Sequence, residues 1–272
     1  MFRLDSKIAV IFGGSGYLGQ QLCLALVEQG ATLYNYDVKK GGGEIIELLE
    51  SKYGDKYHFV QVDASDQKKV KEEAQALINK EKKVDILIIS TTMKGNDFYL
   101  PFENVSVEGW NIGLLGNLTI PFIVTQAFIP FMRERKSGSI INISSHYGLV
   151  GNDQSIYEGS NLHEIYVKDS PEIKQVYSHG VYNAAKGGLN NFTRYLAAYY
   201  GKYNIRINTV SPGGICMKGE NDTFLKKYGA KVPLGRKANP DEINGAVVFL
   251  ASDASTYITG HNLVVDGGYT IW

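Results

Sequence analysis

The sequence contains few cysteines and has no formal net charge. Its only cysteines, Cys23 and Cys216, lie far apart, which excludes a disulfide framework and a cysteine-based metal site. We therefore expect two free thiols in a reducing compartment, and hence a cytoplasmic protein. Because 28 basic residues balance 28 acidic ones, nucleic acid and an anionic membrane surface are poor candidates for partners. A small molecule is the expected ligand.

Long hydrophobic runs are also scarce. The longest apolar stretches, such as residues 86–89 and 247–251, are far shorter than the roughly 20 residues that a membrane-spanning helix needs. The first residues, which include Arg3 and Asp5, lead directly into an apolar segment without the layout of a signal peptide. We expect neither secretion nor a membrane span.

What the chain does contain is a regular alternation of short apolar segments with amphipathic ones. Segments such as residues 8–12 and 139–143 have no polar alternation, which is typical of strands whose two faces are both covered by helices. The pattern predicts a doubly wound α/β fold of the Rossmann type, a parallel sheet of about seven strands with helices on both faces. The predicted strands cover residues 7–12, 32–37, 57–62, 84–90, 139–144, 204–210 and 262–265. The predicted helices cover residues 16–29, 44–53, 66–81, 107–135, 182–200 and 240–251.

The domain organisation follows from the same pattern. No internal repeat or proline-rich linker divides the chain, so residues 1–272 are predicted to form a single domain. Pro121 and Pro130 are placed to bend or shorten the helix at 107–135. Residues 150–180 and 213–239 do not fit the alternation and follow strands at the ligand-binding end of such sheets, which makes them candidate substrate loops.

A glycine-rich turn, GGSGYLG at residues 13–19, follows the first predicted strand and opens the first predicted helix. There, glycines permit close approach of a pyrophosphate, whose charge the free N–H groups and the helix dipole stabilise. The turn predicts an NAD-binding domain, unless it is an ordinary strand-to-helix turn. The residues predicted to contact the cofactor here are Gly13, Ser15, Gly16, Tyr17, Leu18 and Gly19.

Asp37 ends the second predicted strand, near the roughly 20-residue offset at which an acid accepts hydrogen bonds from the adenosine ribose. A carboxylate at that place repels a 2′-phosphate, so NAD is predicted over NADP. Lys39 and Lys40 would bind that phosphate if Asp37 pointed away. A solvated acid at the end of a strand is the simpler alternative.

Tyr182 and Lys186 stand four residues apart at the start of a predicted helix and so project from the same face. A free tyrosine, whose pKa is about 10, is a poor base at neutral pH, but a nearby ammonium group lowers that pKa. The pair is therefore a candidate for proton transfer, although a surface pair on a helix has the same spacing.

The order of these features resembles the short-chain dehydrogenase/reductase family over nearly the whole chain. The resemblance implies a catalytic tetrad, which is formed by Asn117 in GNLTIPF, Ser145 in NISS, Tyr182 and Lys186. The ending ITGHNLVVDGGYT is similar to the family's last strand and tail. The resemblance also implies cofactor contacts from VQVDAS and from SPGG and its neighbour, that is, from Asp63, Ala64, Pro212, Gly213 and Ile215.

The resemblance implies a role for each tetrad member. Ser145 would stabilise charge on the substrate oxygen, and Tyr182 would exchange the proton as general acid or base. Lys186 would hold the ribose hydroxyls, contact the cofactor with Tyr182 and lower the pKa of Tyr182. Asn117 would bind a water that links Lys186 to solvent. A homotetramer or homodimer, built through the helices that contain Asn117 and Tyr182, is also implied.

Three departures from the family pattern concern the substrate and the cofactor. Tyr17 replaces a glycine, a spacing closer to nucleotide-sugar epimerases, and residues 89–92 replace the usual Asn-Asn-Ala-Gly. The interval from Ser145 to Tyr182 is also much longer than is usual. It resembles members that modify polysaccharides or glycans and predicts a sugar-like substrate, unless it is a solvated insertion or a subunit contact. The side chains suited to a sugar are Asp153, Tyr157, Glu158, Asn161, His163, Tyr166, Lys168, Tyr177 and His179.

The predicted function is NAD-linked interconversion of a secondary alcohol and a carbonyl. A nucleotide-sugar epimerase or dehydratase and a non-catalytic NAD-binding scaffold remain open as alternatives. Hydrolysis by Ser145 and His146 is disfavoured, because no Gly-x-Ser-x-Gly elbow surrounds the serine and adjacent strand residues point to opposite faces.

Overall fold

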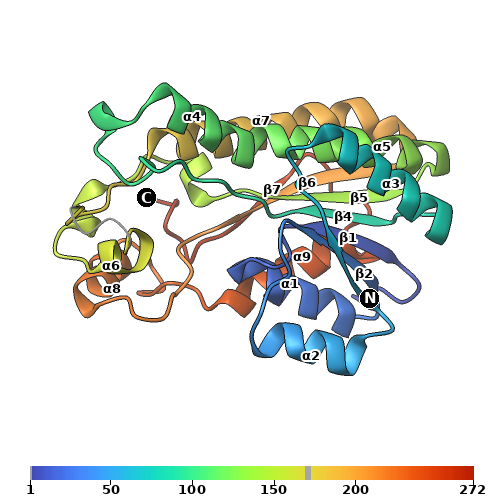
Figure 1. Ribbon diagram of the computed structural model, residues 1–272, viewed down its shortest axis with the longest axis horizontal. Helices are drawn as coiled ribbons and strands as arrows, with labels where there is room; N and C mark the ends of the chain where they lie inside the picture. The colour runs from blue at the N-terminus through green and yellow to red at the C-terminus, as the bar shows by residue number, and fades with distance from the viewer. Residues whose placement is uncertain (1, 169–172) are drawn as a thin grey trace.

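The computed structural model of the chain describes residues 2–168 and 173–272 (Figure 1). Met1 and residues 169–172 lie outside the described residues, and the latter belong to the predicted substrate loop 150–180. In the described part, a central sheet is covered by a layer of helices on each face (Figure 1).

Seven parallel strands form the sheet in the order β3-β2-β1-β4-β5-β6-β7, which confirms the predicted Rossmann-type fold. The chain steps outward from β1 to β3 and then returns past β1 to β4. A crevice for ligands therefore opens at the carboxyl ends of β1 and β4. The strands are β1 (Ile8–Phe12), β2 (Thr32–Asp37), β3 (Tyr57–Gln61), β4 (Ile86–Ile89), β5 (Gly138–Ile143), β6 (Ile205–Pro212) and β7 (Asn262–Val265).

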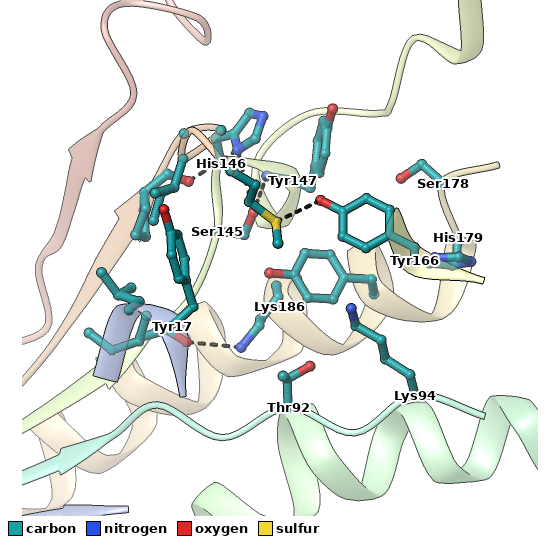
Figure 2. Close-up of a pocket in the computed structure, with 18 of the residues that line it drawn as sticks. Tyr17, Thr92, Lys94, Ser145, His146, Tyr147, Tyr166, Ser178, His179 and Lys186 are labelled. Atoms are coloured by element: carbon teal, nitrogen blue, oxygen red, sulfur yellow. Dashed lines mark hydrogen bonds between the residues drawn. The ribbon is translucent and has the colours of Figure 1, made fainter. Parts of the chain in front are cut away.

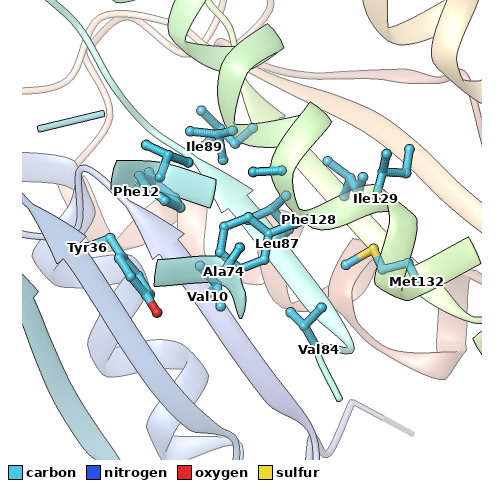
Figure 3. Packing of buried hydrophobic residues seen from close by; sticks show 14 of the residues in the cluster. Val10, Phe12, Tyr36, Ala74, Val84, Leu87, Ile89, Phe128, Ile129 and Met132 are labelled. Atoms are coloured by element: carbon cyan, nitrogen blue, oxygen red, sulfur yellow. The ribbon is translucent and has the colours of Figure 1, made fainter. Parts of the chain in front are cut away.

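The helices form two layers because the strands are apolar on both faces. In β1, Val10 and Phe12 pack under α3, α5 and α7, whereas Ala9 and Ile11 pack under α1, α2 and α9. Figure 3 shows Phe12 near Phe128 in the first layer. Each fully buried large side chain contributes about 1.5–3 kcal/mol. The helices are α1 (Tyr17–Glu28), α2 (Glu44–Tyr53), α3 (Gln67–Glu81), α4 (Val107–Leu114), α5 (Ile120–Arg135), α6 (Leu162–Tyr166), α7 (Gly180–Tyr200), α8 (Asp222–Gly229) and α9 (Asn244–Ala251).

A continuous helical stretch runs from Val107 to Arg135 through α4, a π-helical segment at Leu115–Thr119 and α5. By length and composition it could cross a membrane, with a mean hydropathy of 1.7, but 61% of the tested window is buried inside the protein. It packs against α3 and α7 and is a core helix. The helix itself was predicted at residues 107–135, but it was not recognised as long and apolar enough to span a membrane, because polar residues interrupt its apolar runs.

The expected shortening of this helix by the two prolines was wrong. The helix continues through Pro121 and Pro130 to Arg135. The distortion is the π-helical segment, which ends one residue before Ile120 and so lies just ahead of Pro121. Pro121 lies in the first turn of α5, where its lack of an N–H group is tolerated.

The predicted substrate loops 150–180 and 213–239 contain the short helices α6 and α8, which the sequence analysis did not predict. Together with the end of the chain, they form a second small core. Its buried members are Ile156, Leu162, Val176, Phe224, Tyr228, Val232 and Tyr269. In its described part, the insertion 150–180 is a packed element and not a solvated loop.

Candidate active site

A cavity of about 480 Å³ lies at the carboxyl ends of β1, β4, β5 and β6, where the topology opens a crevice. The predicted residues that line it are Gly13, Gly16, Tyr17, Leu18, Gly19, Ser145, Tyr182, Lys186, Pro212, Gly213 and Ile215. The other predicted residues, all in the described part of the chain, do not line it; they are Ser15, Asp37, Asp63, Ala64 and Asn117.

The glycine-rich turn has the geometry that a pyrophosphate requires. Gly13 has a φ of +83°, and a Cβ at this position would lie 2.5 Å from the carbonyl oxygen of Ser90. A Cβ on Gly19 would collide with the carbonyl oxygen of Gly13. Gly16 is the N-cap of α1, and among the described residues no side chain caps this helix. Backbone N–H groups at the positive end of the helix dipole thus remain for an anion.

Asp37 points toward the glycine-rich turn. Its Oδ2 accepts a hydrogen bond from the backbone N–H of Ser15 over 3.0 Å, and its Oδ1 accepts one from Val38 over 2.8 Å. Lys40 forms an ion pair with Glu50. The carboxylate therefore lies beside the turn, as a ribose-binding acid must, and it does not point away.

Asp63 and Ala64 follow β3, two strands away from β1 in the sheet. The Asp63 side chain is exposed, and its Oδ1 accepts hydrogen bonds from the backbone N–H and the hydroxyl group of Ser65, over 2.9 Å and 2.7 Å. Ala64 is buried. This pair therefore follows the outermost strand on the β3 side of the sheet, next to β2, which ends at Asp37.

Ser145, Tyr182 and Lys186 meet on one wall of the cavity. Ser145 lies just beyond the end of β5 in extended backbone, and Tyr182 lies in the first turn of α7. The Lys186 Nζ donates a hydrogen bond to the carbonyl oxygen of Ile143 over 2.9 Å, which fixes α7 against the end of β5. The same Nζ lies 5.6 Å from the centre of the Tyr182 ring.

Burial dominates the electrostatics of this wall. It lowers the pKa of Lys186 from 10.5 to about 7, because the ammonium form loses solvation. It also raises the pKa of Tyr182, and a hydrogen bond with Ser145 acts in the opposite direction. The pKa of Tyr182 is therefore raised by burial, and the nearby Lys186 does not lower it below its usual value.

Asn117 lies in the π-helical segment and is completely buried. Its Nδ2 donates to the carbonyl oxygen of Gly113 over 2.9 Å, while its Oδ1 has no partner among the described residues. Pro121 has no N–H group and cannot make the i→i−4 hydrogen bond to the Asn117 carbonyl. The Asn117 Oδ1 is thus a buried acceptor without a donor among the described residues, in a segment that packs against α7.

The expectation that Ser145 and His146 point to opposite faces was wrong, because the strand has already ended and His146 begins a 3-10 turn. The His146 Nδ1 lies 3.4 Å from the Ser145 Oγ and 3.1 Å from the carbonyl oxygen of Pro212. A carbonyl only accepts, so Nδ1 carries the proton and cannot take one from Ser145. Burial lowers the pKa of His146 to about 4, which keeps the ring neutral.

The insertion supplies the aromatic side of the cavity. Figure 2 shows Tyr166 and His179 on this side, together with Lys94 from the loop that follows β4. Of the nine side chains predicted to suit a sugar, only Tyr157, Tyr166, Tyr177 and His179 line the cavity. The others, within the described residues, do not line it, and several hold the insertion in place. Asn161, for example, bonds to the backbone of Gly219 and Asn221.

Several residues that line the cavity were not predicted as site residues, and three of them are polar side chains close to the substrate loops. Lys94 and Thr92 follow β4, and Lys237 lies in the second substrate loop. The position of Lys94, just after a strand at the ligand-binding end of the sheet, is a signal that could have revealed it. In residues 2–168 and 173–272, no group of three or more His, Cys, Asp or Glu side chains is placed to hold a metal ion.

The sequence is similar to known dehydrogenases and reductases over most of its length. Residues 7–160 match the family model of the short chain dehydrogenases, and residues 169–270 match that of enoyl-(acyl carrier protein) reductase. The chain is 32% identical to D-threitol dehydrogenase of Mycolicibacterium smegmatis, covering 99% of this chain and 95% of the relative. It is also 32% identical to the ribulose-forming D-arabinitol 2-dehydrogenase of Candida tropicalis, covering 100% of this chain and 95% of the relative.

A solved structure supports the same comparison. The short chain dehydrogenase of Leptospira borgpetersenii with bound NAD+ superposes with a TM-score of 0.84 at 32% identity. The match covers 98% of this chain and 94% of that one. The likeness therefore extends over nearly the whole length of both chains.

Proposed function

Because the chain belongs to the short-chain dehydrogenase family, we propose that it is a nicotinamide-dependent oxidoreductase that interconverts a secondary alcohol and a carbonyl, with Tyr182 as the proton-transfer residue. One observation carries the proposal. Ser145, Tyr182 and Lys186 line a single cavity whose other end is the uncapped glycine-rich turn.

In the proposed mechanism, each of these residues acts through one atom of its side chain. The Ser145 hydroxyl donates to the substrate oxygen, and the Tyr182 hydroxyl removes or returns the proton of that oxygen. Lys186, whose pKa is about 7, passes the proton on from Tyr182. The Asn117 Oδ1, which has no partner among the described residues, would accept a hydrogen bond from a water that links Lys186 to solvent. The nicotinamide, when bound, accepts or gives the hydride.

We propose NAD as the preferred cofactor. The Asp37 carboxylate, held toward the glycine-rich turn by Ser15, would accept hydrogen bonds from the ribose hydroxyls and repel a 2′-phosphate. Lys40 forms an ion pair with Glu50 and is therefore not free to bind such a phosphate. The remaining proposed cofactor contacts are Gly13, Ser15, Gly16, Tyr17, Leu18, Gly19, Asp63, Ala64, Tyr182, Lys186, Pro212, Gly213 and Ile215.

The proposed substrate is a polyhydroxylated, sugar-like molecule. The polyol relatives support it, as do the hydroxyl groups of Tyr157, Tyr166 and Ser178 on the insertion side of the cavity. The insertion would then serve sugar recognition, as in family members that modify polysaccharides or glycans.

We also propose a cytoplasmic homo-oligomer, a dimer or tetramer. The face of α5 and α7 exposes Phe122 and Tyr195, with 44% and 60% of their surfaces accessible, beside a shallow groove lined by Leu118 and Phe192. Apolar side chains gathered on two helices favour a second copy as the partner. Light scattering coupled to gel filtration measures the assembly, and Tyr195→Lys should shift it toward the monomer.

Cofactor reduction over a panel of polyols and simple alcohols tests the catalytic proposal. Tyr182→Phe should lower kcat about 10²- to 10⁴-fold, the usual contribution of a general acid or base, with little change in NAD affinity. Tyr257→Phe is the control, because Tyr257 is fully exposed. Equal turnover by wild type and Tyr182→Phe would overturn the mechanism. Cofactor binding by the wild type without any turnover would favour a scaffold.

A further inference from the structure

The cavity carries positive charge that the proposed reaction does not use. Three lysines line it, Lys94, Lys186 and Lys237, and among the described residues no Asp or Glu does. Lys186 belongs to the proton path. Lys237 forms an ion pair with Glu220, whose side chain is 1% exposed behind the wall. Lys94 is left as a cation in the cavity without a formal countercharge.

Lys94 is held in place by aromatic groups. Its Nζ donates a hydrogen bond to the Tyr99 hydroxyl over 2.6 Å. It lies 5.1 Å and 5.2 Å from the ring centres of Tyr99 and Tyr166, and 5.7 Å from that of Phe98. In the described part of the chain, no carboxylate lies within the 4.0 Å of an ion pair with this Nζ. Three rings and a hydroxyl thus fix the ammonium without neutralising it.

Lys94 lies at the substrate end of the cavity. In Figure 2 it is beside Tyr166 and His179, whereas Tyr17 of the glycine-rich turn lies on the opposite side of Lys186. A group bound to Lys94 is therefore separate from the cofactor's pyrophosphate. It lies on the far side of the proton-transfer residues, where the remainder of a substrate extends.

Filling the cavity changes the solvation of this ammonium. Lys94 is exposed to the cavity, yet enough protein surrounds it that burial already lowers its pKa. A bound substrate removes more of its water. A neutral polyol would offer this cation only hydroxyl acceptors, whereas an anionic group supplies a countercharge and a stronger, charge-assisted hydrogen bond.

We propose that Lys94 binds an anionic group of the substrate, a carboxylate or a phosphate, so that the enzyme acts on a polyhydroxylated acid or phosphate ester in preference to a neutral polyol. This inference rests on the proposed function and adds the charge of the substrate to it. It requires that the anion and the reacting carbon belong to one molecule that spans the cavity from Lys94 to Tyr182.

Three six-carbon ligands that differ at one end test the proposal. They are D-sorbitol, D-gluconate and D-sorbitol 1-phosphate, and each is assayed with NAD and with NADP. The wild type should have a kcat/KM at least about tenfold higher for one of the charged ligands than for sorbitol, and which one identifies carboxylate or phosphate. Lys94→Met should remove this preference, whereas Lys94→Arg should keep it.

Lys168→Met is the matched control, because Lys168 is an exposed lysine of the insertion that does not line the cavity. Calorimetric titration of the three ligands into the protein with NAD gives a second measurement that needs no turnover. Equal binding of charged and neutral ligands would overturn the proposal, as would a Lys94→Met effect on the affinity for NAD or an equal loss for all three ligands.

Failure of this inference is distinguishable from failure of the proposed function. Sorbitol turnover that depends on Tyr182, with no preference for a charged ligand in either measurement, would exclude the anion site and leave the oxidoreductase intact. A wild type that does not bind NAD or NADP would remove the proposed function itself. Charged-ligand binding that Lys94→Met abolishes would support the site even in that case.

Discussion

The hydroxyl group of Tyr17 donates a hydrogen bond to the carbonyl oxygen of Cys216 over 2.7 Å. Tyr17 stands where the family's common turn has glycine, and Cys216 follows the turn after β6. The bond therefore joins the glycine-rich turn to the second substrate loop across the mouth of the cavity. A glycine has no side chain to make this link.

Tyr17→Phe removes only that hydroxyl. A hydrogen bond contributes roughly 1 kcal/mol, so the Kd for the nicotinamide cofactor should rise about two- to fivefold as the loop loosens, while kcat stays nearly unchanged. Fluorescence titration measures the Kd, with Tyr257→Phe as the exposed control. An unchanged Kd in Tyr17→Phe would show that the bond does not hold the loop over the cofactor.

The fold was predictable because both faces of the central strands are covered. The apolar runs IAVIF in β1 and ILII in β4 leave no alternative to a parallel sheet between helices, and the boundaries of β2 and β7 agree with those predicted from the sequence. An apolar run without polar alternation indicates directly that both faces of a strand are buried.

The substrate side of the site was less predictable because it depends on long-range packing. Asn161 and Glu158 have the chemistry of sugar ligands, but their partners on and around α8 lie about 60 residues further along the chain. The surroundings of Lys94 were equally hard to predict, because the rings of Tyr99 and Tyr166 that contact it come from two separate loops. No local sequence pattern indicates which polar side chains bond to distant parts of the chain and so do not line the cavity.

Asn161 connects the insertion to the second substrate loop and provides a test of that packing. Its Oδ1 accepts from the Asn221 N–H over 2.9 Å, and its Nδ2 donates to the Gly219 carbonyl oxygen over 2.7 Å. Asn161→Ala should lower the free energy of unfolding by about 1–2 kcal/mol and raise the substrate KM several-fold. The NAD affinity should not change. Lys168→Ala is the control in the same insertion, and a selective loss of NAD binding would contradict this division.

Asp37 should determine the choice between the two nicotinamide cofactors. Asp37→Asn retains the acceptor for Ser15 but removes the negative charge, so the ratio of kcat/KM for NAD to that for NADP should fall at least about tenfold. Steady-state assays with both cofactors measure the ratio. A wild type that prefers NADP, or a ratio that Asp37→Asn leaves unaltered, would show that the carboxylate does not select between NAD and NADP.

Lys186 should make alcohol oxidation pH-dependent near neutrality. With its pKa lowered to about 7, the amine is neutral above that pH and can accept the proton that leaves through Tyr182. The kcat/KM for oxidation should rise from pH 6 to pH 8 and then level off, and that for reduction should fall over the same range. Arginine stays protonated, so Lys186→Arg should lose the step. A flat wild-type profile between pH 6 and pH 8 would contradict this role.

The same shift predicts how stability depends on pH. Between about pH 7 and pH 10.5 the unfolded chain holds a proton on Lys186 that the folded chain does not, so the contribution of Lys186 to the free energy of unfolding rises with pH across this window. Below pH 7 both states are protonated and the contribution is constant. Lys186→Met removes the ammonium, and its denaturation midpoint should therefore exceed that of the wild type more at pH 6 than at pH 9. A difference that does not vary with pH would mean that Lys186 keeps its charge when buried, and the proton path would then begin at Tyr182 alone.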